Sequence, residues 1–246
     1  MSAATARVGV QLYSLRETAD RAGAFAALAA AGIGAVEPYD LSDVPRLRAD
    51  AGRYGLAIPS VHAREPDPVT LERVAELGAH TLVIPRSEPE DWADADGIRR
   101  VGARLAAWQE RAAAAGLGLA YHNHYWELGR LPDGRHGLDL LAAATPPDVG
   151  FQMDLYWAHV GGADVAALLR RLGDRVRSVH VKDGPGDVAA DQVELGHGTL
   201  PVADVLAAAP PGAMRILEID RCAGPVLDLL ARNRAALARL DPEVAA

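Results

Sequence analysis

The strongest constraint on the fold is a repeat of short apolar runs, each followed by a longer segment rich in Ala, Leu and Arg. Short apolar runs are typical of buried strands, and the longer segments have the periodicity of amphipathic helices. The predicted strands are Val8–Leu12, Ala35–Glu37, Ala57–His62, Thr81–Pro85, Leu117–His122, Val149–Asp154, Val176–Lys182 and Met214–Glu218. The clearest helices between them are Ala22–Ala31, Leu71–Leu77, Ile98–Ala115, Val165–Leu172 and Val226–Leu240. Strands that alternate with helices in this way predict a parallel sheet.

Glycine marks the ends of several predicted helices, directly before the next strand. These glycines are Gly32, Gly55, Gly78, Gly116 and Gly173. Glycine adopts the left-handed conformation that ends a helix and redirects the chain. Eight strands allow closure into a barrel, and the length of 246 residues matches the ~250 residues of one TIM barrel. The sequence therefore predicts a single α/β domain over residues 1–246, folded as a (β/α)8 TIM barrel.

A doubly wound open sheet is the structural alternative. The first strand-to-helix turn reads QLYSLRETADRAG and lacks the G-x-G-x-x-G loop that binds dinucleotides in that fold. No P-loop signature is present either. The longest strand-to-helix connections are expected at 125–136 and 184–199, at the C-terminal ends of the strands, where TIM barrels build active sites.

Composition argues against several classes of protein. The formal net charge is -8 and no basic cluster stands out, so we expect no nucleic-acid partner. No run approaches the ~20 apolar residues that span a bilayer, and the N-terminus MSAATARVGVQLYSL lacks the pattern of a signal peptide. The single cysteine, Cys222, excludes an intramolecular disulfide and a thiolate zinc cluster. A cytoplasmic protein without a membrane partner is the simplest interpretation.

One basic residue differs from all the others. Of the 25 lysines and arginines, only Lys182 is lysine. A compact ammonium differs chemically from a planar guanidinium, which stays charged in every environment. Lys182 therefore marks a position where arginine is a poor substitute, unless it is a chance survivor of a composition biased toward arginine.

Polar residues end four successive predicted strands: His122, Asp154, His180 and Glu218. Each alone has an ordinary explanation, such as a hydrogen-bonded surface histidine, a helix-capping aspartate or a glutamate paired with arginine. All four occupy the same step of the repeat, however, so they should converge above the barrel axis. Two imidazoles and two carboxylates suit one divalent metal ion, Mn²⁺, Mg²⁺, Co²⁺ or Zn²⁺, with positions left open for substrate.

Six motifs extend this interpretation: VGVQLYSLRE, YHNHYWEL, QMDLYWAHVGG, VHVKDG, LGHGTL and LEID. In this order they resemble the sugar phosphate isomerase/epimerase family, whose members have the xylose isomerase-like TIM barrel, over essentially the whole chain. The resemblance implies one metal ion held by residues that end the fifth to eighth strands, here His122, Asp154, His180 and Glu218. Many epimerases have glutamate at the fifth-strand position. This chain has His122 there, with Glu127 close enough to be the alternative, so the symmetric mechanism with two glutamates is in doubt.

The chemistry that fits these residues is metal-assisted proton abstraction next to a carbonyl of a keto sugar or sugar-like polyol. Glu218 is the expected base, and His124 or Glu127 is expected to return the proton on the other face. Lys182 lies two residues after His180 on the same strand face and would neutralise an enolate oxygen. The candidate substrate-binding residues are Glu37, His62, Trp126, Trp157 and Arg221. The product would be an isomer or epimer or, if a group leaves, an elimination product made by a lyase or dehydratase.

Two further alternatives remain open. The chain could be one subunit of a deglycosidase for 3-keto sugars or glycosides that needs a partner chain, and a homo-oligomer is equally compatible with the sequence. A DNA-repair endonuclease of the same superfamily would need a three-zinc site. That alternative is disfavoured because Trp157 stands three residues after Asp154, where those enzymes have histidine, and because the net charge is negative.

Overall fold

All eight predicted strands form, and they are parallel throughout. The computed structural model describes residues 7–244, in which the strands pair in the order β2-β1-β8-β7-β6-β5-β4-β3. Their bounds are β1 Val8–Gln11, β2 Ala35–Glu37, β3 Ser60–His62, β4 Thr81–Ile84, β5 Gly118–His122, β6 Gly150–Asp154, β7 Val176–Val181 and β8 Met214–Leu217. The predicted and observed strands differ only at their ends. The largest difference is at β3, where Ala57–Pro59 precede the regular strand.

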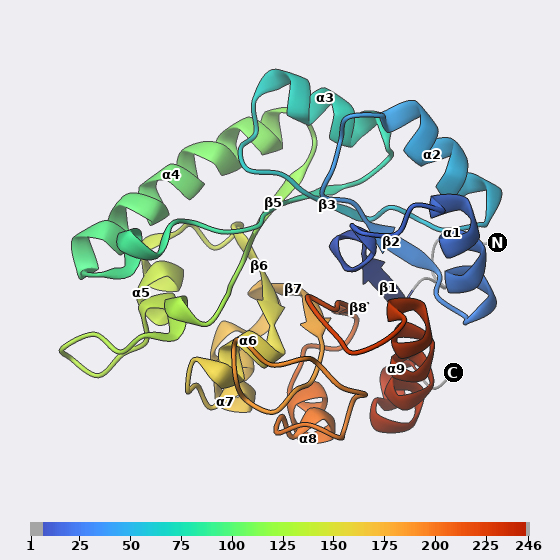
Figure 1. The fold of residues 1–246 in the computed structure, drawn as a ribbon. Coiled ribbons are helices and arrows are strands. Elements are labelled where there is room, and N and C mark those ends of the chain that lie inside the picture. The colour runs from blue at the N-terminus through green and yellow to red at the C-terminus, as the bar shows by residue number, and fades with distance from the viewer. Residues whose placement is uncertain (1–6, 245–246) are drawn as a thin grey trace.

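The sheet closes almost completely into a barrel. Its edge strands β2 and β3 meet at a parallel bridge between Ala35 and Ala57. There the amide of Val36 donates to the carbonyl of Ala57 at 2.9 Å, and the amide of Ala57 donates to the carbonyl of Gly34 at 2.9 Å. The helices surround the strands (Figure 1). The predicted TIM barrel is therefore confirmed, and the open doubly wound sheet is excluded.

The helices lie in the connections between successive strands, except α9 and η6, which follow β8. The α-helices are α1 Arg21–Ala30, α2 Val44–Arg53, α3 Pro68–Glu76, α4 Ala95–Ala114, α5 Gly137–Ala144, α6 Leu155–Val160, α7 Val165–Leu172, α8 Val202–Ala207 and α9 Val226–Leu240. The short 3-10 helices are η2 Leu12–Leu15, η3 Pro89–Trp92, η4 Trp126–Leu128, η5 Gly173–Arg175 and η6 Pro242–Val244. Aspartate side chains cap the N-termini of α1, α2, α3, α4, α6 and α7, which satisfies backbone amides that have no partner inside a helix. Gly32 and Gly116 have φ values of 77° and 75°, as predicted for residues that end helices.

The two ends of the described chain lie together beside α1 and α9 (Figure 1). The guanidinium of Arg7 donates to the carbonyl of Glu243 at 2.7 Å. Residues 1–6, over which no secretory signal was expected, lie outside the described residues. Across residues 7–244, every helix is too short or too polar to cross a bilayer.

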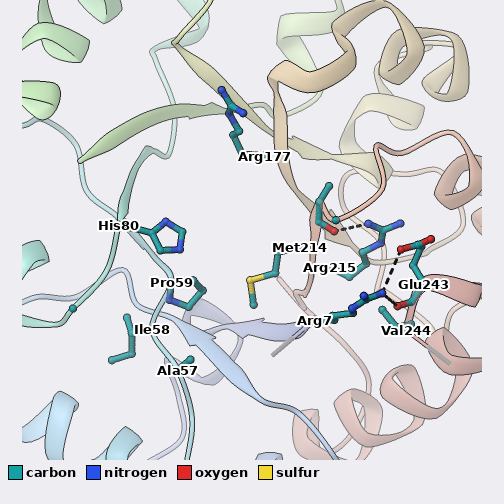
Figure 2. A pocket seen from close by; sticks show the side chains of 13 residues that line it. Arg7, Ala57, Ile58, Pro59, His80, Arg177, Met214, Arg215, Glu243 and Val244 are labelled. Carbon is teal, nitrogen blue, oxygen red and sulfur yellow. Dashed lines mark hydrogen bonds and ion pairs between the residues drawn. The ribbon is translucent and has the colours of Figure 1, made fainter. Parts of the chain in front are cut away.

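A cavity of about 520 Å³ opens at the N-terminal end of the barrel. Figure 2 shows Arg7 and Arg215 on one side of it, His80 on the other and Met214 between them. Glu243 neutralises Arg7 at 3.3 Å, and Asp241 neutralises Arg215 at 2.7 Å. This cavity contains none of the predicted site residues. It lies at the end of a TIM barrel that serves stability rather than catalysis.

The long connection after β7 is held by one buried aspartate. Asp183 accepts hydrogen bonds from the backbone amides of Gly184, Gly196, Gly198 and Leu200, at 2.9, 3.0, 2.9 and 3.1 Å. A Cβ atom at position 198 would lie 2.1 Å from the Asp183 carboxylate, so only glycine fits there. The VHVKDG and LGHGTL motifs therefore meet in space, and they fix the loop that borders the C-terminal face.

Candidate metal centre and active site

The four strand-end residues converge at the C-terminal end of the barrel. His122 ends β5, Asp154 ends β6, His180 lies near the end of β7 and Glu218 follows β8. One donor atom from each lies within 4.8 Å of the corresponding atoms of the other three, and all four residues are buried. Asp154 and His180 are direct partners in the register of β6 and β7. Barrel closure thus assembles these two imidazoles and two carboxylates into one compact group, the metal set.

Asp154 shows most directly that a cation fits this set. Its Oδ1 accepts from the amide of Trp157 at 2.8 Å and caps α6. Within residues 7–244, its buried Oδ2 has no assigned hydrogen bond. Oδ2 forms an ion pair with Lys182 Nζ at 2.7 Å, and His122 Nε2 lies 3.9 Å from it. Helix capping and metal binding are therefore compatible, because each role uses a different oxygen.

The only lysine of the chain lies at the centre of this charge cluster. Lys182 is fully buried, and its Nζ lies 2.7 Å from Asp154 Oδ2, 2.5 Å from Glu218 Oε2 and 2.7 Å from Asp220 Oδ2. Burial lowers its pKa, but the three carboxylates outweigh that effect and raise the pKa well above its usual value. Three carboxylates surround one ammonium, and this excess of acidic groups favours a cation beside them.

The pKa values of the two carboxylates in the metal set, Asp154 and Glu218, are shifted in opposite directions. Burial raises the pKa of Asp154 to about 6, and the negative charge of Glu218 adds to the effect while Lys182 opposes it. Burial also raises the pKa of Glu218, but Lys182 and His180 outweigh it and hold that pKa well below its usual value. Glu218 is therefore ionised at neutral pH, as a base must be.

The two imidazoles also have opposite charge states. Both ring nitrogens of His180 face carboxylates, with Nδ1 at 3.0 Å from Glu218 Oε2 and Nε2 at 2.8 Å from Glu37 Oε1. Burial lowers the pKa of His180, but Glu218 and Glu37 raise it to about 10 overall. Burial and the neighbouring imidazoles hold the pKa of His122 well below its usual value, so this ring is neutral, as a metal ligand must be.

A cavity of about 390 Å³ opens onto the cluster from the C-terminal face. Its lining residues are Tyr13, Tyr39, His62, Ala63, Arg64, Pro85, Arg86, His122, His124, Trp157, Glu218 and Asp220. Five predicted site residues are therefore part of its wall: His62, His122, His124, Trp157 and Glu218. The volume falls in the usual range for sites that take up a small molecule, ~300–1,000 Å³.

His62 contributes to the same region as a third imidazole. A donor atom of His62 lies within 4.8 Å of donor atoms of His122 and His180, which makes a second possible ligand group. The His62 and His180 rings are stacked, with centroids 5.5 Å apart and an interplanar angle of 1°. The two groups share His122 and His180, so within residues 7–244 they describe one centre rather than a three-metal site.

Glu127 does not reach the cavity, which corrects its expected role as a ligand or proton donor. The residue lies in η4 and is fully buried. Its carboxylate accepts from the hydroxyl of Tyr121 at 2.9 Å and from the amide of His124 at 2.9 Å. Glu127 therefore fixes the loop that carries His124, and His122 is the fifth-strand residue of the metal set.

Three expected substrate-binding residues also lie outside the cavity wall. Arg221 is exposed, pairs with Asp191 at 3.2 Å and lines a different surface depression. Trp126 stacks on His124 with ring centroids 4.3 Å apart, so it supports that imidazole. Glu37 is 1% exposed and contacts the cluster at His180 Nε2, 2.8 Å from its Oε1, rather than lining the cavity. The structure does not place these three residues in the cavity wall, and their substrate contacts stay predictions.

Sequence reasoning missed several residues of the wall. Tyr39, Arg64, Arg86 and Asp220 line the cavity but were not predicted. Each of the four follows shortly after the C-terminal end of a strand, as His124 does after β5. A search for a second polar or aromatic residue after every strand end would have found them.

Comparisons with known proteins agree with this architecture. Residues 25–221 match a family described as xylose isomerase-like TIM barrel. The rhizopine catabolism protein MocC of Rhizobium meliloti is 34% identical over 104 residues, which is 42% of this chain and 29% of that protein. This chain therefore matches less than a third of the length of that relative.

Solved structures share the fold along the whole chain. A sugar phosphate isomerase/epimerase from Parabacteroides distasonis ATCC 8503 gives a TM-score of 0.77 at 22% identity, covering 99% of this chain and 97% of that one. An L-ribulose 3-epimerase gives a TM-score of 0.71 at 16% identity, covering 97% and 94%. At such identities the likeness shows the fold alone, whereas the family match spans most of the sequence. The chain belongs to the xylose isomerase-like TIM barrel family.

Proposed function

We propose that the protein is a divalent-metal-dependent isomerase or epimerase. Its substrate would be a keto sugar or sugar-like polyol, from which it removes a proton next to the carbonyl. The observation that carries this proposal is the position of Glu218, which is ionised, faces the cavity and belongs to a set of four side chains that could hold a metal ion. Structural neighbours named as a sugar phosphate isomerase/epimerase and an L-ribulose 3-epimerase support this class of substrate.

His122, Asp154, His180 and Glu218 would hold the metal, which could be Mn²⁺, Mg²⁺, Co²⁺ or Zn²⁺. When bound, such an ion supplies Lewis acidity that stabilises negative charge on the carbonyl oxygen of the substrate. The nitrogen and oxygen donors of these four residues suit all of the named ions.

Glu218 is the proposed base because its two oxygens have different surroundings. Within residues 7–244, its hydrogen bonds are made at Oε2, to Lys182 at 2.5 Å and His180 at 3.0 Å. Oε1 is thus left to accept a proton from a substrate in the cavity. Lys182 keeps the carboxylate charged and restrains its rotation, which supports the acid–base chemistry without direct substrate contact.

His124 is the proposed partner that returns the proton. Its ring lines the cavity and is held by the stacking contact with Trp126 and by the bond from its amide to Glu127. Trp157, at 5.0 Å from Lys182 Nζ to the ring centroid, offers an aromatic face to the C–H surface of a sugar. Elimination by a lyase would begin with the same proton abstraction, so the substrate's leaving group decides between the two outcomes.

Deuterium exchange tests the proposed reaction class. We expect Mn²⁺-loaded protein in D₂O to introduce deuterium next to the carbonyl in at least one member of a panel of free and phosphorylated keto sugars. The exchange is measured by proton NMR, and EDTA should suppress it. Exchange by the isolated chain would also argue against a subunit that needs a partner. Absence of exchange across the whole panel, with metal bound, would contradict the proposal.

A further inference from the structure

A buried polar network lies directly beneath the metal set, and the proposed chemistry does not use it. We propose that Glu37 and Gln152 are positioning residues that fix which ring nitrogen of His180 and His122 faces the metal. The inference rests on the proposed metal site and deepens it. It assigns His180 Nδ1 and His122 Nε2 as the ligand atoms.

Glu37 determines the orientation of His180. Its Oε1 lies 2.8 Å from His180 Nε2, on the side of the ring opposite the metal set. The other nitrogen, Nδ1, lies 3.0 Å from Glu218 Oε2 and so points into the set. A carboxylate that accepts the Nε2 proton leaves Nδ1 as the nitrogen that would give up its proton to bind a metal, and such outer partners commonly orient histidines that bind metals.

Gln152 determines the orientation of His122 in the same way. Its Oε1 accepts from His122 Nδ1 at 3.0 Å and from His62 Nε2 at 2.6 Å. An amide oxygen only accepts hydrogen bonds, so each of these histidine nitrogens carries a proton. The remaining nitrogen of His122, Nε2, lies 3.9 Å from Asp154 Oδ2 and is free to bind a cation.

The two orienting residues are tied to each other, which fixes the direction of every bond. Gln152 Nε2 donates to Glu37 Oε2 at 2.8 Å and to Ser178 Oγ at 3.1 Å. Gln11 Nε2 donates to Glu37 Oε1 at 2.9 Å, and the Ser60 hydroxyl donates to Glu37 Oε2. Because only the Gln152 nitrogen can donate to Glu37, the Gln152 oxygen must face the histidines.

Burial makes this arrangement costly to disturb. Gln11, Glu37 and Gln152 are at most 1% exposed, so water cannot replace a lost partner. The groups that hydrogen-bond to the Glu37 carboxylate can all donate a proton: the side-chain amides of Gln11 and Gln152, the Ser60 hydroxyl and the His180 imidazole. Glu37 is therefore the acceptor in this network.

Glu37→Gln gives a direct test. The new amide nitrogen would face the donor nitrogen of Gln152 or that of His180, so one of these contacts must break. We expect the affinity for Mn²⁺, measured by calorimetry on folded metal-free protein, to fall about 10–100-fold. Ser178→Ala is the matched control, since it removes a partner of Gln152 without touching an imidazole, and its Mn²⁺ affinity should stay close to that of the wild type.

The exchange Glu37→Gln/Gln152→Glu separates positioning from the mere loss of a charge. In the double variant, the new glutamine can donate to the new glutamate while its oxygen still accepts from His180. The new glutamate accepts from His122, so every bond is again satisfied. We expect the double variant to bind Mn²⁺ more tightly than Glu37→Gln alone. Binding no tighter than that of Glu37→Gln would overturn the positioning role.

Nitrogen-15 NMR of the Zn²⁺-loaded wild type provides a readout that needs no variant. The expected spectrum shows His180 protonated at Nε2 and His122 protonated at Nδ1, and the opposite tautomers would overturn the assignment. Wild-type affinity in Glu37→Gln would overturn the inference while the proposed function stands. A wild-type protein that binds no Mn²⁺ would overturn both.

Discussion

Glu218→Gln is expected to lower the rate of deuterium exchange into substrate by about 10²–10⁴-fold, the usual contribution of a positioned general base. The amide has nearly the shape of the carboxylate and can still fill the space between Lys182 and His180, but it cannot take a proton. The substitution also replaces one candidate ligand with a weaker one. The exchange rate is therefore measured at saturating Mn²⁺, with metal content determined on the same sample.

Glu88→Gln is the matched control for this loss. Glu88 is an exposed carboxylate near the cavity mouth, where it pairs with Arg86 at 2.6 Å, and it lies outside the metal set. Its substitution should leave the exchange rate close to that of the wild type. If Glu218→Gln retained the wild-type rate with metal bound, another residue would be the base and the proposed mechanism would be wrong.

Lys182→Met is expected to have the largest effect on stability. The ammonium is fully buried between Asp154, Glu218 and Asp220, so its removal leaves three carboxylates that repel one another and takes away their shared ion-pair partner. Breaking a buried ion pair from one side typically costs about 3–5 kcal/mol. We expect the free energy of unfolding of the metal-free variant to be lower than that of the wild type by this amount. Urea titration of both proteins measures the difference.

Mn²⁺ should restore more stability to Lys182→Met than it adds to the wild type, since the variant offers the ion a more negative site. Lys182→Arg serves as the control for charge alone. It keeps the positive charge, but a planar guanidinium does not fit a point between three carboxylates, so only part of the lost stability should return. Full stability of metal-free Lys182→Met would contradict the role assigned to this lysine.

Much of the architecture follows from local sequence patterns. The apolar runs predicted all eight strands because buried parallel strands have apolar residues on both faces. The positions of His122, Asp154, His180 and Glu218 predicted their convergence, since parallel strands end at the same rim of a barrel. That these four side chains lie close together could be inferred without knowing the conformation of any loop.

The depth and direction of the remaining side chains could not be predicted in this way. Strands of a barrel are tilted and staggered, so residues at equivalent strand ends lie at different heights. Glu37 contacts the metal set at His180 rather than belonging to it, although it ends β2 just as His122 ends β5. Glu127 and Arg221 belong to connections whose conformation depends on tertiary contacts, with Tyr121 and Asp191 respectively. The sequence positions of Glu127 and Arg221 therefore could not predict that their side chains point away from the cavity.

Metal content tests the central claim most directly. Wild-type protein and Asp154→Asn are each equilibrated with Mn²⁺, freed of unbound ion and analysed for manganese per chain. Asp154 Oδ2 is a buried oxygen without a hydrogen bond, so it should be the ligand whose loss the site tolerates least. We predict one Mn²⁺ per wild-type chain and a large loss in Asp154→Asn. Equal manganese in both proteins, or none in the wild type, would contradict the metal centre.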